Sequence, residues 1–297
     1  MSGEGFDMFV GVDWSGAMGT RLPGLQVAVA LPGRAAPCPV PPPAGRYWDR
    51  ENLYLWLGRQ SRTRRLFAGI DFAFSLPHAD SGCYFPGLEM QPRSAPALWS
   101  QVEADCTHAP DLYGAPFYTR TDRPWRRYVL SPAGRGDRYR YRQRQTERAC
   151  AAETSPHPVL KCIGPANVGT GSFAGMRMLH RIATGPFAGQ VAIWPFDPAR
   201  GRSVVAEIFP RLFYVRAGVD PRHWQDPDTM ERALARYHSD PPDPAWRPVR
   251  DDETDAVLVA AALRDLVPEH CAVPSGLAGT VLREGWIFGV AWEGAGR

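Results

Sequence analysis

Two runs of apolar residues near the start of the chain each end at an aspartate. FVGV is followed by Asp13, and LFAGI is followed by Asp71. Short apolar runs without a helical period are typical of strands that are buried on both faces. We therefore predict strands that end at these two residues. The apolar run LQVAVALP at 25–32 predicts another strand, which we expect to pair with the first.

Helical spacing is clearest in two segments. In ENLYLWLGRQ, residues Leu53, Trp56 and Leu57 recur at helical intervals. The segment DETDAVLVAAALRDLV at 252–267 has acids in its first turn and Ala and Leu throughout, which predicts a buried helix. The pattern further predicts a helix over 175–183 and strands over 191–197, 203–215 and 284–290.

Alternating strands and helices predict an α/β fold in which helices flank one sheet. Five prolines at 36–45 predict a surface loop without regular structure. Residues 80–150 are rich in Pro, Tyr, Trp and Arg and have weak periodicity. We interpret them as an insertion or lid without a hydrophobic core of its own, within a single domain that spans 1–297.

Carboxylates stand where the predicted strands end. Besides Asp13 and Asp71, Glu207 lies late in the apolar run VVAEIFP, and Asp252 and Asp255 share one face of the late helix. Ligands of open α/β sheets bind at the carboxyl ends of the strands. These acids would repel one another without a partner, and a divalent cation with oxygen ligands is a suitable one.

Each acid also has an ordinary interpretation. An acid in the first turn of a helix, such as Asp251, often caps it. A strand-end Asp can hold backbone amides in an Asx turn, and Glu207 can pair with Arg211. The joint pattern favours a metal site over these separate roles.

Four motifs carry a resemblance to a known family: GVDWSGA at 11–17, GIDFAFS at 69–75, AEIFPR at 206–211 and DDETDA at 251–256. In this order they resemble a family of predicted nucleases with an RNase H-like fold (domain of unknown function 429). The likeness covers most of the chain outside 80–150. It implies an RNase H-like mixed sheet flanked by helices, with a Pro/Arg/aromatic-rich insertion.

The resemblance also implies roles for the acids. Asp13 on the first strand would bridge two metal ions, Asp71 would be the acid of the fourth strand, and Asp252 and Asp255 would be the acids of the late helix. In related Holliday-junction resolvases the second acid is a Glu, whereas here the strand Glu is Glu207, later in the chain. We therefore expect Glu207 to be an assisting catalytic residue, at a position that differs from the order of acids in the resolvases.

The resulting hypothesis is a nuclease that hydrolyses DNA or RNA with Mg²⁺ or Mn²⁺. A first alternative is a phosphotransferase or ATPase of the actin-like relatives, which share the opening G-[IV]-D. A second is a non-catalytic binding protein on the same fold. A GTGSFA segment at 169–174 matches a dinucleotide-binding pattern, but no clear strand precedes it, so we expect no dinucleotide cofactor.

Arginine carries almost all of the positive charge. The net charge is +3, and 33 of the 34 basic residues are Arg, since Lys161 is the one lysine. Arg suits bidentate phosphate binding, although a GC-rich genome produces the same bias. Residues 120–148 hold ten Arg against three acids, with aromatic residues between them. We expect nucleic-acid contacts from Arg138, Arg140, Arg142, Arg144 and Arg211; the alternative is a lid whose arginines pair with acids.

The chain start and the cysteines predict a cytoplasmic protein. The first residues contain no basic region before an apolar run, and no apolar run approaches the roughly 20 residues that span a bilayer. We therefore expect no membrane partner. The six cysteines form no C-x-x-C pair, so we expect free thiols.

Overall fold

The computed structural model describes residues 5–164, 167–270 and 278–291, and divides into two compact units. We call them the sheet unit (residues 1–15, 21–71 and 189–272) and the helical unit (residues 16–20, 72–188 and 273–297). Each unit is assembled from segments that are far apart in the sequence. The second unit thus includes much more of the chain than the insertion predicted over 80–150.

Six strands form one mixed sheet in the sheet unit, in the order β3-β2-β1-β4-β8-β7. Strands β1, β4, β8 and β7 are parallel, and β2 and β3 continue the sheet in antiparallel fashion. The bounds are β1 Met8–Asp13, β2 Gln26–Ala30, β3 Cys38–Pro39, β4 Leu66–Ile70, β7 Val191–Ile193 and β8 Ser203–Glu207. The α/β class and the mixed sheet agree with the sequence pattern.

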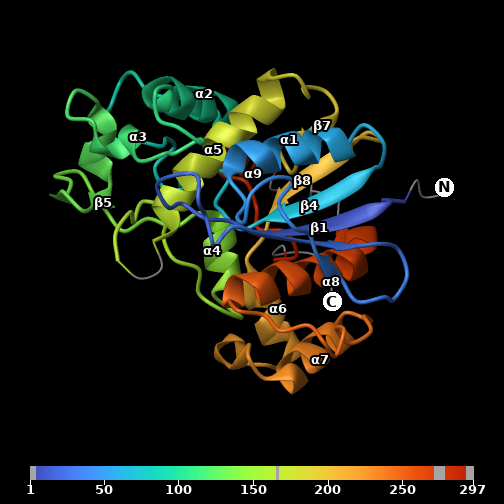
Figure 1. Cartoon of the computed structure of the whole chain (residues 1–297). Coiled ribbons are helices and arrows are strands. Elements are labelled where there is room, and N and C mark those ends of the chain that lie inside the picture. Colours follow the sequence, from blue (N-terminus) through green and yellow to red (C-terminus); the bar gives the residue numbers. More distant parts are fainter. Residues whose placement is uncertain (1–4, 165–166, 271–277, 292–297) are drawn as a thin grey trace. The chain divides into compact units, whose positions relative to one another are not determined.

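Helices cover the sheet on both faces (Figure 1). Helix α1 lies on one side of the strands and α8 on the other, where α6 and α7 pack against α8. The bounds are α1 Arg50–Gln60, α6 Pro210–Ala217, a 3₁₀ turn Pro221–His223, α7 Pro227–Arg236 and α8 Asp251–His270. Both helices that the sequence predicted most clearly, α1 and α8, are present.

Two glycines let α8 approach the sheet closely. A side chain at Gly11 of β1 would run into the Ala256 carbonyl oxygen and approach the Ala260 nitrogen to 2.8 Å. A side chain at Gly69 of β4 would meet Leu263 of the same helix at 2.9 Å. Because side chains alternate between the faces of a strand, Asp13 lies on the same face as Gly11, and Asp71 on the same face as Gly69.

Two strand predictions and one loop prediction need correction. The segment predicted as a strand over 203–215 changes after Glu207, because Pro210 begins α6 and suits the first position of a helix. Cys38–Pro39 pairs with β2 despite its proline, which an edge strand tolerates. Residues 284–290 add no strand to the main sheet; helix α9 (Ala278–Glu284) ends there, and the apolar side chains after it are buried without one.

The helical unit has its own hydrophobic core, so the interpretation of 80–150 as a segment without one is wrong. Phe117 stacks on Trp125 at 5.5 Å and packs against Phe173 and Phe85. Aromatic side chains fill this core without a regular period, which is why the pattern did not reveal it. Its other elements are α2 Ala95–Cys106, α3 Pro116–Thr119, a 3₁₀ turn Pro124–Tyr128, β5 Leu130–Ser131, β6 Gly134–Arg135, α4 Gln145–Cys150 and α5 Val168–Thr184.

Helix α5 begins earlier than the sequence pattern predicts. Asn167 caps it by accepting a hydrogen bond from the Thr170 nitrogen at 3.1 Å. The glycines of GTGSFA therefore lie inside the helix rather than in a loop before it. A side chain at Gly175 would run into the Phe72 ring, so this glycine serves close packing. Figure 1 shows α5 lying along α2, which it contacts.

The structure also bears on the cysteines and on membrane-spanning helices. Cys38, Cys83, Cys106, Cys150 and Cys162 form no disulfide bond among the described residues, and Cys271 lies outside them. Within the described ranges, no helix combines the length and apolar character that crossing a bilayer requires.

The close approach at Gly11 leads to a stability prediction. Gly11→Ala should lower the free energy of unfolding by about 3 kcal/mol, because the obstacle is the backbone of α8, which cannot rotate away. Chemical denaturation measures this loss. Gly5→Ala is the matched control, since no atom lies within 4 Å of the added methyl group. Equal stability of the two variants would contradict the packing of β1 on α8.

Candidate metal centre

Asp13 and Asp71 stand side by side at the carboxyl edge of the sheet. Strands β1 and β4 are parallel and in register, with Val12 opposite Ile70. The ladder continues one step further, because the Asp71 nitrogen donates to the Val12 carbonyl oxygen at 3.1 Å. The two carboxylates therefore leave neighbouring strands at the same level and, as the glycine contacts show, on the face that α8 covers.

Helix α8 brings two further acids to this edge. Ala256 and Ala260 lie directly over Gly11, so the preceding turn of α8 reaches the end of β1. The carboxyl groups of Asp13 and Asp252 share a hydrogen bond. These contacts confirm that the two strands are adjacent and that the amino end of the late helix packs at their carboxyl edge.

The electrostatics of Asp13 and Asp71 reflect this crowding. Burial is the main cause that raises the pKa of Asp13 well above its ordinary value, followed by the charges of Asp255, Asp71 and Asp252. Burial also raises the pKa of Asp71, followed by the charges of Asp255 and Glu207. Asp13 and Asp71 are therefore costly to ionise beside their acidic neighbours, a cost that a bound cation would offset.

Asp255 has a specific hydroxyl partner in Tyr214. Burial raises the pKa of Asp255 to about 7, while a hydrogen bond with Tyr214 opposes the shift. The Tyr214 hydroxyl also lies 3.1 Å from Oγ1 of Thr254. Sequence reasoning missed Tyr214, because it lies on α6 in the segment that was predicted to be a strand.

The loop after Asp13 is held by a buried arginine. Arg50 of α1 has no solvent exposure, and its Nε donates to the Ser15 carbonyl oxygen at 2.9 Å. Its guanidinium carbon lies 5.8 Å from the centre of the Trp14 ring. Arg50 thus fixes the two residues that follow Asp13, although nothing in the helical pattern of 51–60 distinguished it.

Glu207 occupies a different position from the aspartates. It is opposite Ile70 in the register of β8 with β4, whereas Ala206 is opposite Gly69. Because side chains alternate between the two faces of a strand, Glu207 and Asp71 project from opposite faces of the sheet. The charge of Glu207 nevertheless raises the pKa of Asp71. Arg211 is exposed on α6.

The chemistry of these donors can be compared with that of metal sites. Asp13, Asp71, Asp252 and Asp255 offer only carboxylate oxygens, which fit hard divalent cations such as Mg²⁺ or Mn²⁺. Across the described parts of the chain, no three His, Cys, Asp or Glu side chains form a group ready to hold a metal ion. The donor chemistry therefore fits, while a coordination shell requires the side chains to draw closer together.

Two of the predicted nucleic-acid contacts are corrected by the structure. Arg142 is 8% exposed and donates to Asp80, to Ser81 and to backbone carbonyl groups of the helical unit. Arg144 is 1% exposed, and its guanidinium donates to Glu147 and to the Glu284 carbonyl oxygen. Their donors are occupied inside the protein, so these arginines have a structural role instead of the predicted one.

The other two positions of this stretch are more accessible. Arg138 is half-buried and donates to the carbonyl groups of Pro86 and Gly87. Arg140 is exposed and donates to the Tyr139 carbonyl oxygen. Both line a hollow of about 280 Å³ in the helical unit. A role in nucleic-acid binding stays a prediction for Arg138, Arg140 and Arg211.

Comparisons of the chain with protein-family models, with curated proteins and with solved structures gave no match. The family resemblance of the four motifs stays a prediction.

The raised pKa values predict a pH dependence for the metal-free protein. A carboxyl with a raised folded-state pKa binds its proton more tightly when the protein is folded, so its contribution to stability is lost as the pH rises. For Asp255 the window extends from the ordinary value of 3.8 to about 7. In EDTA, the melting temperature should fall across this window, and Asp255→Asn should reduce the fall. A fall of equal size in the variant would contradict the assignment.

The buried arginines lead to a second stability prediction. Arg144→Ala should cost about 3–5 kcal/mol, because it leaves the Glu147 carboxylate, itself 1% exposed, without its ion-pair partner. Arg140→Ala removes the same charge four residues away and should change the free energy of unfolding by no more than about 0.5 kcal/mol. Urea unfolding of both variants compares them. Equal effects would mean that Arg144 is not a structural residue.

Proposed function

We propose that the protein is a divalent-metal-dependent phosphodiesterase that cleaves nucleic acid. The observation that supports this proposal best is the placement of Asp13 and Asp71 at one level on adjacent parallel strands, with Asp252 and Asp255 brought to them by α8. Burial and neighbouring acids raise the pKa values of Asp13, Asp71 and Asp255, which makes the ionised site costly for the folded protein, and a bound cation would offset that cost. Proteins generally retain such an unfavourable arrangement of charges only at functional sites.

The fold supports an RNase H-like assignment at a finer level. The resemblance requires acids on the first strand, on the fourth strand and on a late helix. Strand β4 is the fourth strand of the chain and pairs directly with β1, and α8 is the last helix of the sheet unit. The three acidic elements thus meet at one edge of the sheet.

In the proposed mechanism, Mg²⁺ or Mn²⁺ supplies an activated water and stabilises the leaving oxygen when bound. Asp13, Asp71, Asp252 and Asp255 would hold the metal ion, and Asp13 would contribute most, because the charges of the other three all act on it. Tyr214 orients Asp255 through the hydrogen bond that favours the ionised carboxylate. Glu207 would assist from the opposite face of the sheet, where its charge raises the pKa of Asp71.

Substitution of Asp13 tests the proposed function directly. Asp13→Asn should weaken Mn²⁺ binding at least about 100-fold, since substitution even of a residue behind a metal ligand costs up to about that factor. The same variant should cleave neither DNA nor RNA. In EDTA it should be more stable than the parent, because a repelling charge has been removed. Calorimetry with Mn²⁺, a cleavage assay and a melting curve give the three readouts.

Asp228→Asn is the matched control, because Asp228 is exposed in the first turn of α7, in the same unit, and is not among the charges that act on the four acids of the site. It should bind Mn²⁺ and cleave nucleic acid like the parent. Equal Mn²⁺ binding by the parent and by Asp13→Asn would refute the metal centre. Metal-dependent hydrolysis of ATP without cleavage of DNA or RNA would instead favour the phosphotransferase alternative.

A further inference from the structure

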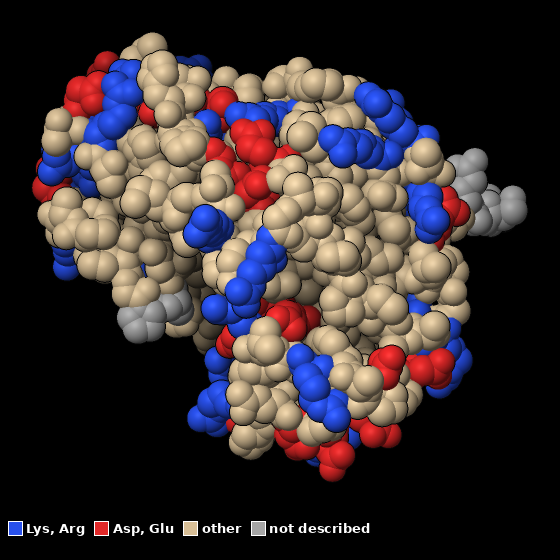
Figure 2. Space-filling view, in the orientation of Figure 1, with Lys and Arg blue, Asp and Glu red and all other residues tan. Residues whose placement is uncertain are grey.

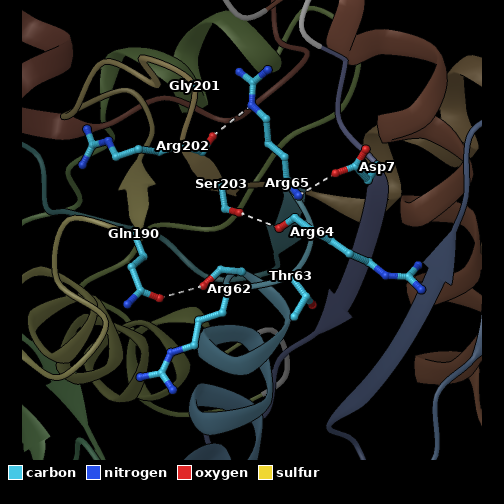
Figure 3. Close-up of a pocket in the computed structure, with 10 residues that line it drawn as sticks. Asp7, Arg62, Thr63, Arg64, Arg65, Gln190, Gly201, Arg202 and Ser203 are labelled. Carbon is cyan, nitrogen blue, oxygen red and sulfur yellow. Dashed lines mark hydrogen bonds between the residues drawn. The ribbon is translucent and has the colours of Figure 1, made fainter.

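A hollow of about 520 Å³ opens at the end of the sheet opposite the carboxylates (Figure 3). It is formed where the four parallel strands begin. Asp7, Arg65, Gln190 and Arg202 line it, and they directly precede β1, β4, β7 and β8. The turn after α1, residues 61–65, forms another part of the wall.

Positive charge dominates this hollow. Arg62, Arg64, Arg65 and Arg202 line it, and among its described lining residues Asp7 alone is acidic. The Asp7 carboxylate accepts a hydrogen bond from the Arg65 backbone nitrogen at 2.8 Å, and it supplies one negative charge against the four positive charges of the lining. Figure 2 shows basic side chains gathered on this side of the sheet unit. All four arginines stay charged at neutral pH.

The arginines differ in how firmly they are held. Arg65 donates to the Arg202 carbonyl oxygen at 3.3 Å and lies 4.4 Å from the centre of the Phe6 ring. Arg202 donates to the Pro198 carbonyl oxygen at 2.7 Å. Arg62 and Arg64 are exposed, and within the described residues the Arg64 guanidinium has no hydrogen-bond partner. Arg65 and Arg202 are thus held by backbone carbonyl groups, while Arg62 and Arg64 contribute exposed positive charge.

The direction of the side chains indicates the kind of ligand. Figure 3 shows the four guanidinium groups spread around the opening, pointing away from one another. A compact anion such as free phosphate requires convergent donors, whereas a polyanion can meet spread ones at successive phosphates. No large apolar side chain is among the described lining residues, although binding to a lipid surface usually needs one.

We propose that this basic hollow binds the phosphodiester backbone of a nucleic acid. The inference deepens the proposed function and rests on it for the identity of the ligand. The hollow and the carboxylates lie at opposite ends of the six-residue strand β1, about 20 Å apart. A duplex that reaches both needs at least about six base pairs. The hollow contributes affinity and register, while base identity is read elsewhere or not at all.

The test compares two double variants of equal charge in EDTA, where no cleavage occurs. Arg62→Ala/Arg64→Ala removes the exposed pair of the hollow. Arg232→Ala/Arg236→Ala removes two exposed arginines of α7 in the same unit. Fluorescence anisotropy with labelled single strands and duplexes of about 20 nucleotides, longer than the span above, measures affinity at several salt concentrations.

The hollow variant should bind at least about tenfold more weakly, and its salt dependence should flatten by about one unit per arginine removed. The α7 variant should bind like the parent. Arg62→Lys/Arg64→Lys should retain most of the affinity, which separates lost charge from lost folding. Binding that depends on these arginines supports the hollow even if no nucleic acid is ever cleaved, an outcome that would refute the nuclease alone.

Three results would overturn the inference. One is equal loss of affinity in the hollow and α7 variants. Another is a parent that binds neither probe at low salt. The third is a parent that binds vesicles of acidic lipid through Arg62 and Arg64 more tightly than it binds either oligonucleotide.

Discussion

The contact of α8 with Gly11 is the constraint on which the candidate site depends. A helix normally packs on a sheet through a layer of side chains, but here the backbone of α8 meets the backbone of β1. The small side chains of Ala256 and Ala260 complete this approach from the helix. Because the helix is this close, its first turns reach the ends of β1 and β4 and bring Asp252 and Asp255 to Asp13. A larger residue at Gly11 would separate the acids and weaken their coupling.

The carboxylate cluster opposes the stability that this packing provides. Apolar strands and an alanine-rich helix exclude water from the surroundings of Asp13 and Asp71, and the same exclusion raises the cost of charging them. Tyr214 offsets part of that cost for Asp255 by donating a hydrogen bond. An electrostatic cost of this kind, at the end of buried strands, is typical of sites that bind a ligand.

Sequence pattern predicted the part of the site in which local order is strong. Asp13 and Asp71 could be placed because each ends an apolar run, and α8 because it is long and alanine-rich. Tyr214 and Arg50 could not be placed, because their roles depend on contacts between distant segments. Arg142 and Arg144 were misjudged for a related reason: charge density along a sequence does not reveal burial. In the helical unit such arginines hold loops together, much as Arg177 joins Glu103 to the carbonyl groups of Ala109 and Tyr113.

The division of the chain into interleaved units has a consequence for its synthesis. Strands β1 and β4 are made early, yet the helix that covers Gly11 begins only at Asp251. At usual translation rates, roughly 5–20 residues per second, those apolar strands wait for about 10–40 seconds before their cover leaves the ribosome. The helical unit is completed later still, because Glu284, which accepts hydrogen bonds from the backbone nitrogens of His78 and Gln145, is made after α8. Nascent chains of this protein therefore expose a half-built sheet, the kind of surface that chaperones shield from aggregation.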